Sequence, residues 1–383
     1  MSIVAQAPVM NALERFHACM RYDAVDRVPN HEVGVWAQTR ERWRSEGMAV
    51  DDMHWDWFVG DPYWDMDPRE YIPVRFDMIP AFEEKVVERD GDTEIIQDAA
   101  GRLRRALVSG AQDGMRASMD EYMRFPVQTL QDFRELKQRF RPSSSSRFPP
   151  YWRETHLEGW RRRRHPLVLG PNCSTLGFYW RAREWMGTEG VSYAWYDEPE
   201  LMHEMMEFVA DFTVETARPI LDEVAPDYVF INEDLSMKTG PLLSPDMYRT
   251  FILPHMKRLV RFLKERGVSW VVVDTDGNCE LVLPLFLEAG VDAVWPIERA
   301  AEMDPLALRR KFGRDLRLWG GVDKRELARG PSAIDAHLRT LRPLVEEGGF
   351  IPTVDHLVPP DVSLADFRHY MDRKRRLLRG EPF

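Results

Sequence analysis

The sequence predicts an α/β fold, a (βα)8 TIM barrel with an N-terminal extension and an antiparallel hairpin insertion. Short β-rich runs alternate with helical stretches from residue 165 onward, polar residues follow the ends of these runs, and an earlier Asp-Gly dipeptide separates two alternating segments. Several right-handed βα units close into a barrel more economically than they form an open sheet. The pattern alone leaves a doubly wound sheet open as the alternative.

The strand-forming runs are short and apolar, and turns or helical stretches separate them. They are RVPNHEVG (27–34), PLVLG (166–170), DYVFINED (227–234), VSWVVVDTDG (268–277), VDAVWPIE (291–298), LRLWGGVD (316–323) and GFIPTVDH (349–356). Between them, residues 199–224 and 244–267 carry apolar side chains at spacings of three and four, which predicts helices.

The N-terminal part reads differently. Residues 83–108 predict two antiparallel strands, because the Asp-Gly dipeptide at Asp90 lies between alternating apolar residues. We expect residues 1–383 to form a single domain, with residues 45–150 as an insertion or lid region within it.

Composition narrows the class of protein. A formal net charge of −11 argues against nucleic acid as the partner, since phosphate binding needs a basic face. No apolar run approaches the roughly 18 residues that cross a bilayer, and the first residues do not resemble a secretory signal. The three cysteines are too widely spaced for a disulfide framework or a CxxC knuckle. We therefore expect a cytoplasmic enzyme that does not bind membranes.

Polar residues gather where the predicted strands end, which is where barrel enzymes carry their catalytic groups. The set is His31, Glu32, Asn172, Asn232, Glu233, Asp234, Asp274, Asp276, Asn278, Glu298, Asp323, Lys324, Asp355 and His356. Eight of these are carboxylates, and like charges in one small cavity raise one another's pKa. We therefore expect something positive at this end of the barrel.

Three occupants would supply that charge: a divalent metal, a cationic substrate, or arginines from the N-terminal segment. Asp, Glu and His are ligands for zinc, magnesium or manganese. Trp36, Trp180, Trp295 and Trp319 lie near the same strand ends and could hold a quaternary ammonium group or stack on a ring. The structural alternative is that Asp276 and Asp323 cap helices and that the tryptophans belong to the core.

Six segments together resemble the uroporphyrinogen decarboxylase superfamily, which includes decarboxylases and zinc- or corrinoid-linked methyltransferases on one barrel. They are NALERFHACMRYDAVDRVPNHEV, FDMIP (76–80), GPNCSTLGFYW (170–180), EDLSMKTGPLLSPDMYRTFILPHMKRLV (233–260), VDTDGN (273–278) and GGFIPTVDHLVPPDVS (348–363). The resemblance implies that Asp77, Tyr179 and His356 are catalytic. It also implies a homodimer.

The departures from the family pattern bear on the substrate. An arginine-rich segment clamps the acidic substrate in the decarboxylases, and here Arg40, Arg42 and Arg44 are only loosely comparable. The thiolate zinc ligands of the thiol methyltransferases are missing. If a metal remains, the candidate ligands are Asp274, Asp276, Glu298 and His356, and the candidate substrate-binding residues are His31, Glu32, Trp36, Arg40, Asn172, Asn232, Asp234 and Trp295.

Three functions follow from these expectations. The first is a methyltransferase that moves a methyl group from a small O- or N-methylated substrate to a corrinoid acceptor on a partner protein, with metal or acid assistance. It accounts best for the acidic strand ends. The second is a decarboxylase of uroporphyrinogen or of a smaller aromatic acid, and the third is a non-catalytic binding protein on the same scaffold.

Overall fold

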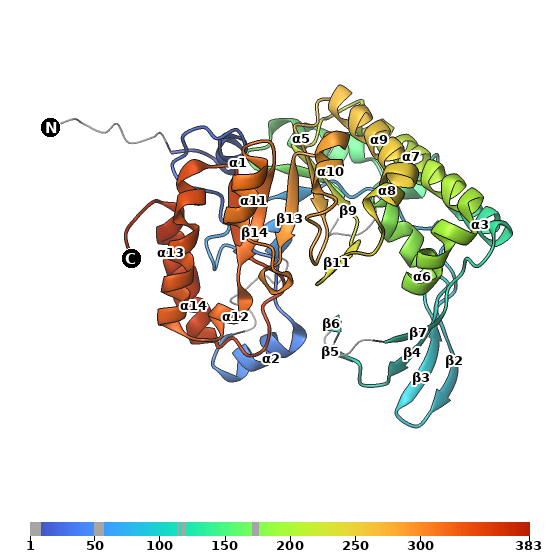
Figure 1. Ribbon diagram of the computed structural model, residues 1–383, viewed down its shortest axis with the longest axis horizontal. Coiled ribbons are helices and arrows are strands. Elements are labelled where there is room, and N and C mark those ends of the chain that lie inside the picture. Colours follow the sequence, from blue (N-terminus) through green and yellow to red (C-terminus); the bar gives the residue numbers. More distant parts are fainter. Residues whose placement is uncertain (1–8, 50–56, 113–114, 117–119, 171–175) are drawn as a thin grey trace.

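The computed structural model describes residues 9–49, 57–112, 115–116, 120–170 and 176–383. Its centre is a curled sheet of seven strands in the order β1-β8-β9-β12-β13-β14-β15, and every neighbouring pair is parallel (Figure 1). The strands are β1 (Glu70–Tyr71), β8 (Leu167–Leu169), β9 (Tyr228–Asn232), β12 (Trp270–Asp274), β13 (Ala293–Ile297), β14 (Arg317–Val322) and β15 (Phe350–Val354). The predicted α/β fold with parallel βα units is confirmed, and the curled sheet is consistent with a TIM-like barrel.

Continuous apolar runs explain why these strands lie at the centre. All residues of β8, β9, β12, β13 and β15 are buried. A parallel sheet covered on both faces needs such runs, because neither face meets water. Six of the seven predicted strands are therefore present, and β1 is a two-residue strand that the pattern did not reveal.

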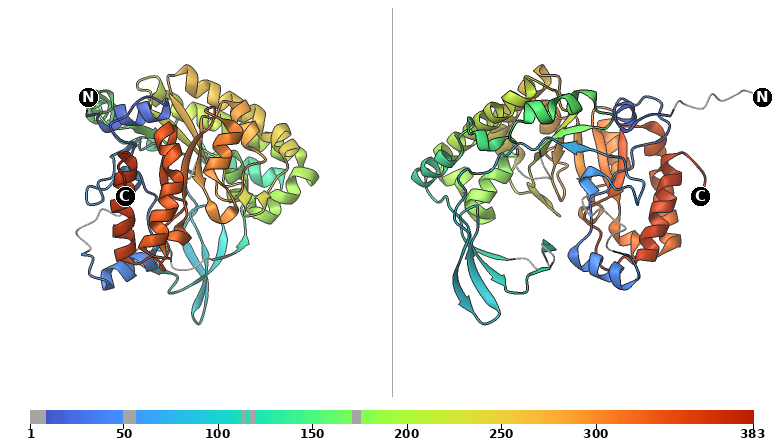
Figure 2. Two further views of the ribbon diagram at one scale, coloured as in Figure 1. Left: turned by 60° about the vertical axis from the view of Figure 1, so that its left-hand side comes forward. Right: turned by 180° about the vertical axis from the view of Figure 1, so that it is seen from behind.

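Helices cover the outside of the sheet (Figures 1 and 2). The longer ones are α1 (Ala12–Met20), α2 (Ala37–Ser45), α3 (Leu130–Leu136), α6 (Phe178–Asp197), α7 (Pro199–Leu221), α9 (Leu253–Glu265), α10 (Leu283–Ala289), α11 (Pro305–Phe312), α13 (Pro331–Glu347) and α14 (Leu364–Leu378). Shorter ones are α4 (Trp152–Thr155), α5 (Leu157–Arg162), α8 (Pro245–Met247) and α12 (Lys324–Leu327). The predicted helix at 244–267 contains α8, a π-helical turn (Tyr248–Ile252) and α9, because Pro254 has no amide hydrogen to continue a regular ladder.

The predicted strand at 27–34 is wrong. This segment is extended but forms no ladder, and its neighbour Val35 makes only an isolated bridge to Val358. Pro29 lacks an amide hydrogen, and the amide of Asn30 donates to the Asp67 carboxylate at 2.7 Å instead of to a strand. Single contacts hold the segment in place of a ladder: the Asn30 carbonyl accepts from the Asp67 amide at 2.9 Å, and the Glu32 carboxylate accepts from the Val354 amide of β15 at 2.9 Å.

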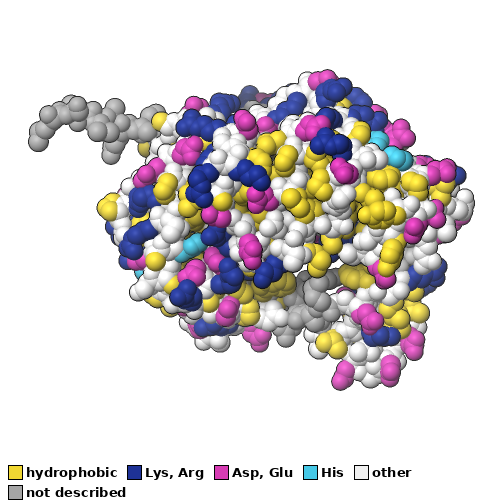
Figure 3. Space-filling view, viewed as in Figure 1, with side chains coloured by type: hydrophobic (Ala, Val, Ile, Leu, Met, Phe, Trp, Pro, Cys, Tyr) yellow, Lys and Arg dark blue, Asp and Glu magenta, His cyan; other side chains and the backbone are white. Residues whose placement is uncertain are grey.

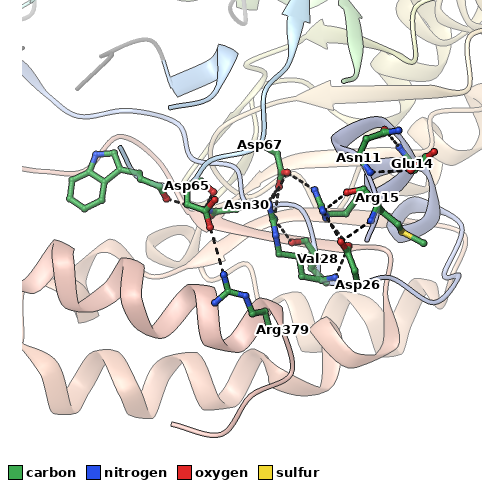
Figure 4. Close-up of polar contacts among 12 residues, drawn as sticks. Asn11, Glu14, Arg15, Asp26, Val28, Asn30, Asp65, Asp67 and Arg379 are labelled. Atoms are coloured by element: carbon green, nitrogen blue, oxygen red, sulfur yellow. Dashed lines mark hydrogen bonds and ion pairs between the residues drawn. The ribbon is translucent and has the colours of Figure 1, made fainter. Parts of the chain in front are cut away.

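A buried ion network holds this segment (Figure 4). The guanidinium of Arg15 donates to Asp26 and to Asp67, each at 2.7 Å, and Arg27 donates to Asp67 at 2.6 Å. Arg379 lies 3.8 Å from Asp65, so the end of α14 also reaches this region. Two guanidinium groups on one carboxylate satisfy the oxygens that burial removes from water.

A separate antiparallel sheet projects from the body (Figures 1 and 2). It consists of β2 (Lys85–Asp90), β3 (Thr93–Gln97), β4 (Leu103–Leu107) and β7 (Glu121–Arg124), with β5 (Ala111–Gln112) and β6 (Met115–Arg116) beyond it. β2 and β3 pair across the Asp-Gly turn as expected. That residues 45–150 form an insertion or lid within one domain stays a prediction.

The outer surface carries both signs of charge. On the face in Figure 3, Lys and Arg side chains are interspersed with Asp and Glu, and apolar side chains gather around α8 and α10. Many of these charges form local pairs, such as Lys257 with Glu288 at 2.8 Å. None of the helices among the described residues combines the length and apolar character that a membrane crossing requires.

Candidate active site

A pocket of about 310 Å³ lies at the carboxyl ends of the central strands. Its described lining is Val33, Phe58, Trp180, Asn232, Asp234, Asp274, Asp276, Trp295, His356 and Leu357. Half of these side chains are apolar, and the other half are carboxylates, an amide and an imidazole. An apolar cavity with a few convergent polar groups is the usual form of a small-molecule site.

Six of the residues expected at the site meet in this pocket. Asn232 and Asp274 end β9 and β12, which are neighbours in register, and Trp295 pairs with Asp274 across β12 and β13. Asp234, Asp276 and His356 follow β9, β12 and β15 by two residues each. Parallel strands bring their carboxyl ends to one edge of the sheet, which explains why residues so distant in sequence converge.

His356 lies between a carboxylate and an indole. Its Nε2 is 3.3 Å from Asp276 Oδ2, and its ring stacks on Trp36 at a centroid distance of 6.3 Å. Burial alone lowers the pKa of His356, but the hydrogen bond and charge of Asp276 outweigh it, so the pKa lies above its usual value. The imidazole therefore keeps its proton to a higher pH than an unperturbed histidine and is placed to donate it into the pocket.

The other pocket carboxylates also have partners. Asp234 pairs with Arg183 of α6 at 2.5 Å, and Asp274 accepts a hydrogen bond from the Asn232 amide at 3.1 Å. Burial raises the pKa of Asp234, although Arg183 opposes this effect. Asp234 is thus paired with a cation, whereas Asp274 is hydrogen-bonded to a neutral amide.

Glu233 lies behind the pocket and is fully buried. Its carboxylate accepts from the amides of Phe178 and Tyr179, at 3.2 and 2.7 Å, where α6 begins. Burial raises the pKa of Glu233 to about 8. Gly177 precedes this contact, and a Cβ there would lie 1.4 Å from the Asn232 carbonyl oxygen, so only glycine lets α6 approach β9 this closely.

Tyr179 is adjacent to the pocket but does not line it. The ring is buried, burial raises the pKa of its hydroxyl to about 12, and the hydroxyl has no hydrogen-bond partner among the described residues. Its role as a catalytic residue stays a prediction.

Side chains of the protein supply much of the positive charge expected at the strand ends. Lys324 pairs with Glu298 at 3.1 Å, Arg325 pairs with Asp323, and Arg183 pairs with Asp234. Asp323 caps α12, as the structural alternative held, whereas Asp276 pairs with His356. These cations come from α6 and from the region of α12.

Three of the four candidate metal ligands, Asp274, Asp276 and His356, line the pocket, and the fourth does not. Glu298 lies outside the pocket lining, where its oxygens accept from the Gly277 amide and from Lys324. Across the described residues, no group of three or more His, Cys, Asp and Glu side chains is placed to hold a metal ion. A metal site at Asp274, Asp276, Glu298 and His356 therefore stays a prediction.

Other expected site residues lie away from the pocket. Asp77 is half exposed, pairs with Arg75 at 2.6 Å and lines a different surface cavity near the antiparallel sheet. His31 is buried edge-on to Trp319, and burial lowers its pKa well below the usual value. Arg40 lies on α2 and is not among the described pocket residues. Asn172 lies outside the described residues.

Glu32 is also separate from the pocket. It is buried with Lys374 at 2.6 Å and accepts from the Val354 amide at 2.9 Å. Through these contacts, Glu32 connects the N-terminal segment to β15 and to α14.

Sequence reasoning missed the apolar lining residues Val33, Phe58 and Leu357, and it missed Arg183, which pairs with Asp234. Phe58 lies on a short 3-10 turn (Trp57–Val59) within the irregular N-terminal region, and no periodic pattern marks it. Arg183 was not singled out, although it lies on α6 one helical turn after Tyr179, on a helix whose start the GPNCSTLGFYW segment indicates. Of the four tryptophans considered, Trp180 and Trp295 line the pocket, Trp36 stacks on His356, and Trp319 belongs to the core.

Comparison with protein families gives a match to the model of uroporphyrinogen decarboxylase (URO-D) over residues 182–377. A uroporphyrinogen decarboxylase from Nocardia farcinica is 30% identical over 174 residues, which cover 44% of this chain and 46% of that protein. Another from Hyphomonas neptunium is 25% identical over 211 residues, which cover 54% of this chain and 57% of that protein. The chain thus spans about half the length of the curated relatives it matches.

Among solved structures, a methyltransferase from Methanosarcina mazei superposes with a TM-score of 0.55. The match covers 96% of this chain and 99% of that chain at 13% sequence identity. Identity this low shows a shared fold and leaves the chemistry to be argued from the pocket.

Proposed function

The chain belongs to the uroporphyrinogen decarboxylase family, and from this premise we propose that its pocket transfers a methyl group from a small O- or N-methylated substrate to a corrinoid acceptor on a partner protein. The observation that carries the proposal is the pocket lining. It presents three carboxylates and three large aromatic side chains, and no arginine or lysine is among its described residues. Such a lining disfavours a substrate with many carboxylates, because like charges repel in a confined site.

In this proposal, His356 is the general acid. When the bond between the methyl carbon and the substrate oxygen breaks, the electron pair stays on oxygen, and His356 donates its proton there. Asp276 stabilises the protonated form of His356, and Trp36 packs against its ring. The methyl acceptor, a reduced corrinoid, is a co-substrate that approaches the mouth of the pocket.

The second candidate is a decarboxylase acting on an aromatic acid. The names of the curated relatives favour it, since both are uroporphyrinogen decarboxylases. The same His356 proton donor could protonate the carbon that loses CO2. The acidic lining favours the first candidate over this one.

An assay with two readouts separates these functions. The purified protein is supplied with reduced cobalamin and a panel of O- and N-methylated donors, and demethylated product is measured by liquid chromatography. In parallel, CO2 release is measured from uroporphyrinogen and from small aromatic acids. We expect demethylation, and we expect His356→Ala to lower its rate by about a hundredfold or more.

His203→Ala provides the matched control, because His203 is exposed on α7. Its activity should equal that of the wild type. Release of CO2 without demethylation would replace methyl transfer by decarboxylation. Two further expectations remain predictions: a homodimer and a cytoplasmic location. A non-catalytic binding role remains the last alternative to the two enzymatic functions.

A further inference from the structure

We propose that Asp355 is a positioning residue for His356, because its buried carboxylate holds the turn that carries the imidazole against the segments after two neighbouring strands. Asp355 directly precedes His356 and is fully buried. It is not among the described residues of the pocket lining, so any effect on a reaction there passes through another residue. The inference rests on the proposed function in one respect, namely that His356 supplies a proton.

Two backbone amides converge on the Asp355 carboxylate. Its Oδ1 accepts from the Lys324 amide at 3.1 Å, and its Oδ2 accepts from the Arg299 amide at 2.8 Å. Lys324 is the first residue of α12, and Arg299 is the first residue of a 3-10 turn (Arg299–Ala301) after β13. The first amides of a helical turn have no partner within it, so both need an outside acceptor. One side chain therefore ties the end of β15 to the segments that follow β13 and β14.

The turn after β15 is also held at its far end. The Val358 amide donates to the Gly34 carbonyl at 2.9 Å, which attaches the turn to the N-terminal segment. Between Asp355 and Val358 lie only His356 and Leu357, and both line the pocket. A two-residue segment that is anchored on both sides has few backbone conformations left, so the anchors decide where the imidazole points.

A second chain of contacts reaches the partner of His356. The Lys324 ammonium donates to Glu298 Oε1 at 3.1 Å, and Glu298 Oε2 accepts from the Gly277 amide at 3.0 Å. Gly277 directly follows Asp276, whose carboxylate pairs with His356. Lys324 therefore takes part in the contacts on both sides, through its amide and through its side chain. We expect it to be a second positioning residue.

The contact between His356 and Asp276 leaves little room for movement. The imidazole Nε2 lies 3.3 Å from Asp276 Oδ2, which is already at the outer end of hydrogen-bond distances. A further displacement of about 1 Å would break the contact, and misplacement of a reacting group by about 1 Å can lower a rate about a hundredfold.

Asp355→Asn tests the inference. The amide has the same shape as the carboxylate, but its NH2 group faces one of the two backbone N–H groups, so that N–H loses its acceptor. We expect the turn to shift and kcat for the proposed demethylation to fall about tenfold or more. KM should change less than about twofold, because the described lining keeps all its side chains.

A readout that needs no substrate separates position from activity. The His356 and Trp36 rings stack at a centroid distance of 6.3 Å, so nuclear Overhauser contacts between the labelled rings report where the imidazole lies. The signals of His356 are identified by their loss in His356→Gln. We expect Asp355→Asn to weaken the ring contacts, which a change of charge without movement would leave intact.

Two further variants complete the comparison. Lys324→Met keeps the amide that donates to Asp355 and removes the contact with Glu298, and it should weaken the ring contacts to a smaller extent. Its side chain is partly exposed, so this variant should fold even if Asp355→Asn does not. Asp292→Asn is the matched control, because its carboxylate also accepts from a backbone amide, that of Val271, but at the opposite end of the strands. Its ring contacts and kcat should equal those of the wild type.

The outcomes are distinct. Ring contacts that weaken in Asp355→Asn and persist in Asp292→Asn would support the inference. Unchanged ring contacts in both Asp355→Asn and Lys324→Met would overturn it, whatever the activity. If melting curves show that Asp355→Asn is unfolded, the ring contacts of Lys324→Met decide. Weakened ring contacts, together with a wild type that demethylates no donor, would keep the positioning role and overturn the proposed function.

Discussion

At the scale of single residues, the His356 and Asp276 pair controls the state of the proposed acid. The pKa of His356 is raised because Asp276 stabilises the imidazolium more than burial destabilises it. The protonated form is therefore present below the raised pKa and is lost as the pH rises through it. Activity that depends on this proton should fall along an alkaline limb.

Replacing Asp276 should move that limb. In Asp276→Asn the charge that raises the pKa of His356 is gone, so burial lowers the pKa and the limb shifts to lower pH. The measurement is the pH profile of kcat/KM for the wild type and the variant. A limb that stays in place, with an unchanged profile shape, would mean that His356 does not supply the proton.

The sequence indicated which residue types would meet here, but not how they would pair. Asp276 and Asp323 both follow a strand, and helix capping was a sound alternative for each. Only the fold shows that Asp323 caps α12 while Asp276 faces His356 from a different strand. Pairing across strands depends on register and rotamer, which no local pattern contains.

At the scale of elements, Glu233, which follows β9, forms hydrogen bonds with the start of α6. Two α6 amides donate to its carboxylate, Arg183 reaches the side chain and carbonyl of Asp234, and Gly177 contacts the Asn232 carbonyl oxygen. These contacts fix Trp180, on α6, relative to Asn232 and Asp234. One wall of the pocket therefore depends on a residue that does not line it.

The buried carboxyl of Glu233 should make stability depend on pH. Its folded pKa of about 8 is above the ordinary value, so its contribution is full below the unfolded pKa and is lost as pH rises through 8. Glu233→Gln cannot ionise, so its melting temperature relative to wild type should rise between pH 5 and pH 8. At low pH, where Glu233 is protonated in the folded and unfolded states, Glu233→Ala should lose roughly 1–3 kcal/mol, because two buried amides lose their acceptor.

Thermal unfolding at several pH values measures both effects. Glu288→Gln is the control, since Glu288 is a surface carboxylate paired with Lys257 and Arg249. A pH-independent difference between wild type and Glu233→Gln would show that Glu233 keeps one protonation state across this range.

The central strands were predictable because the signal for a buried strand lies within the strand's own sequence. β9, β12, β13 and β15 are apolar runs bounded by turns, and such runs identify buried strands wherever they lie. The segment at 27–34 has a similar composition, yet it is not a strand. Its backbone donors bond to distant groups such as the Asp67 side chain, and these partners are known only once the chain has folded.

At the scale of the whole molecule, the N-terminal segment lies against both edges of the seven-stranded sheet. Glu32 accepts from the β15 amide of Val354, while Asn30 donates to Asp67 three residues before β1. The curled sheet and its barrel-like form were predictable from the repeated βα pattern. The way the two edges are joined was not, because it rests on buried ion pairs between residues more than 300 positions apart, such as Glu32 and Lys374.

The stability of the contact between α14 and the N-terminal segment should depend on a single charge. Lys374 is fully buried, and its Nζ donates to Glu32 Oε1 and to the His31 carbonyl, each at 2.6 Å. Burial lowers the pKa of Lys374, and the charge of Glu32 opposes this effect. Each charge of the pair therefore stabilises the charged form of the other. Lys374→Met leaves the Glu32 carboxylate buried without its cation, and we expect a loss of roughly 3–5 kcal/mol in unfolding free energy.

The double variant Lys374→Met with Glu32→Gln distinguishes a stranded charge from lost packing. With both charges removed, the neutral amide can still accept from the Val354 amide through its oxygen and donate to the Tyr370 hydroxyl through its NH2 group, so most of the lost stability should return. Urea unfolding of wild type, single and double variants, followed by circular dichroism, gives the comparison. A double variant no more stable than Lys374→Met would mean that the lysine stem and its carbonyl contact, rather than the ion pair, join α14 to the N-terminal segment.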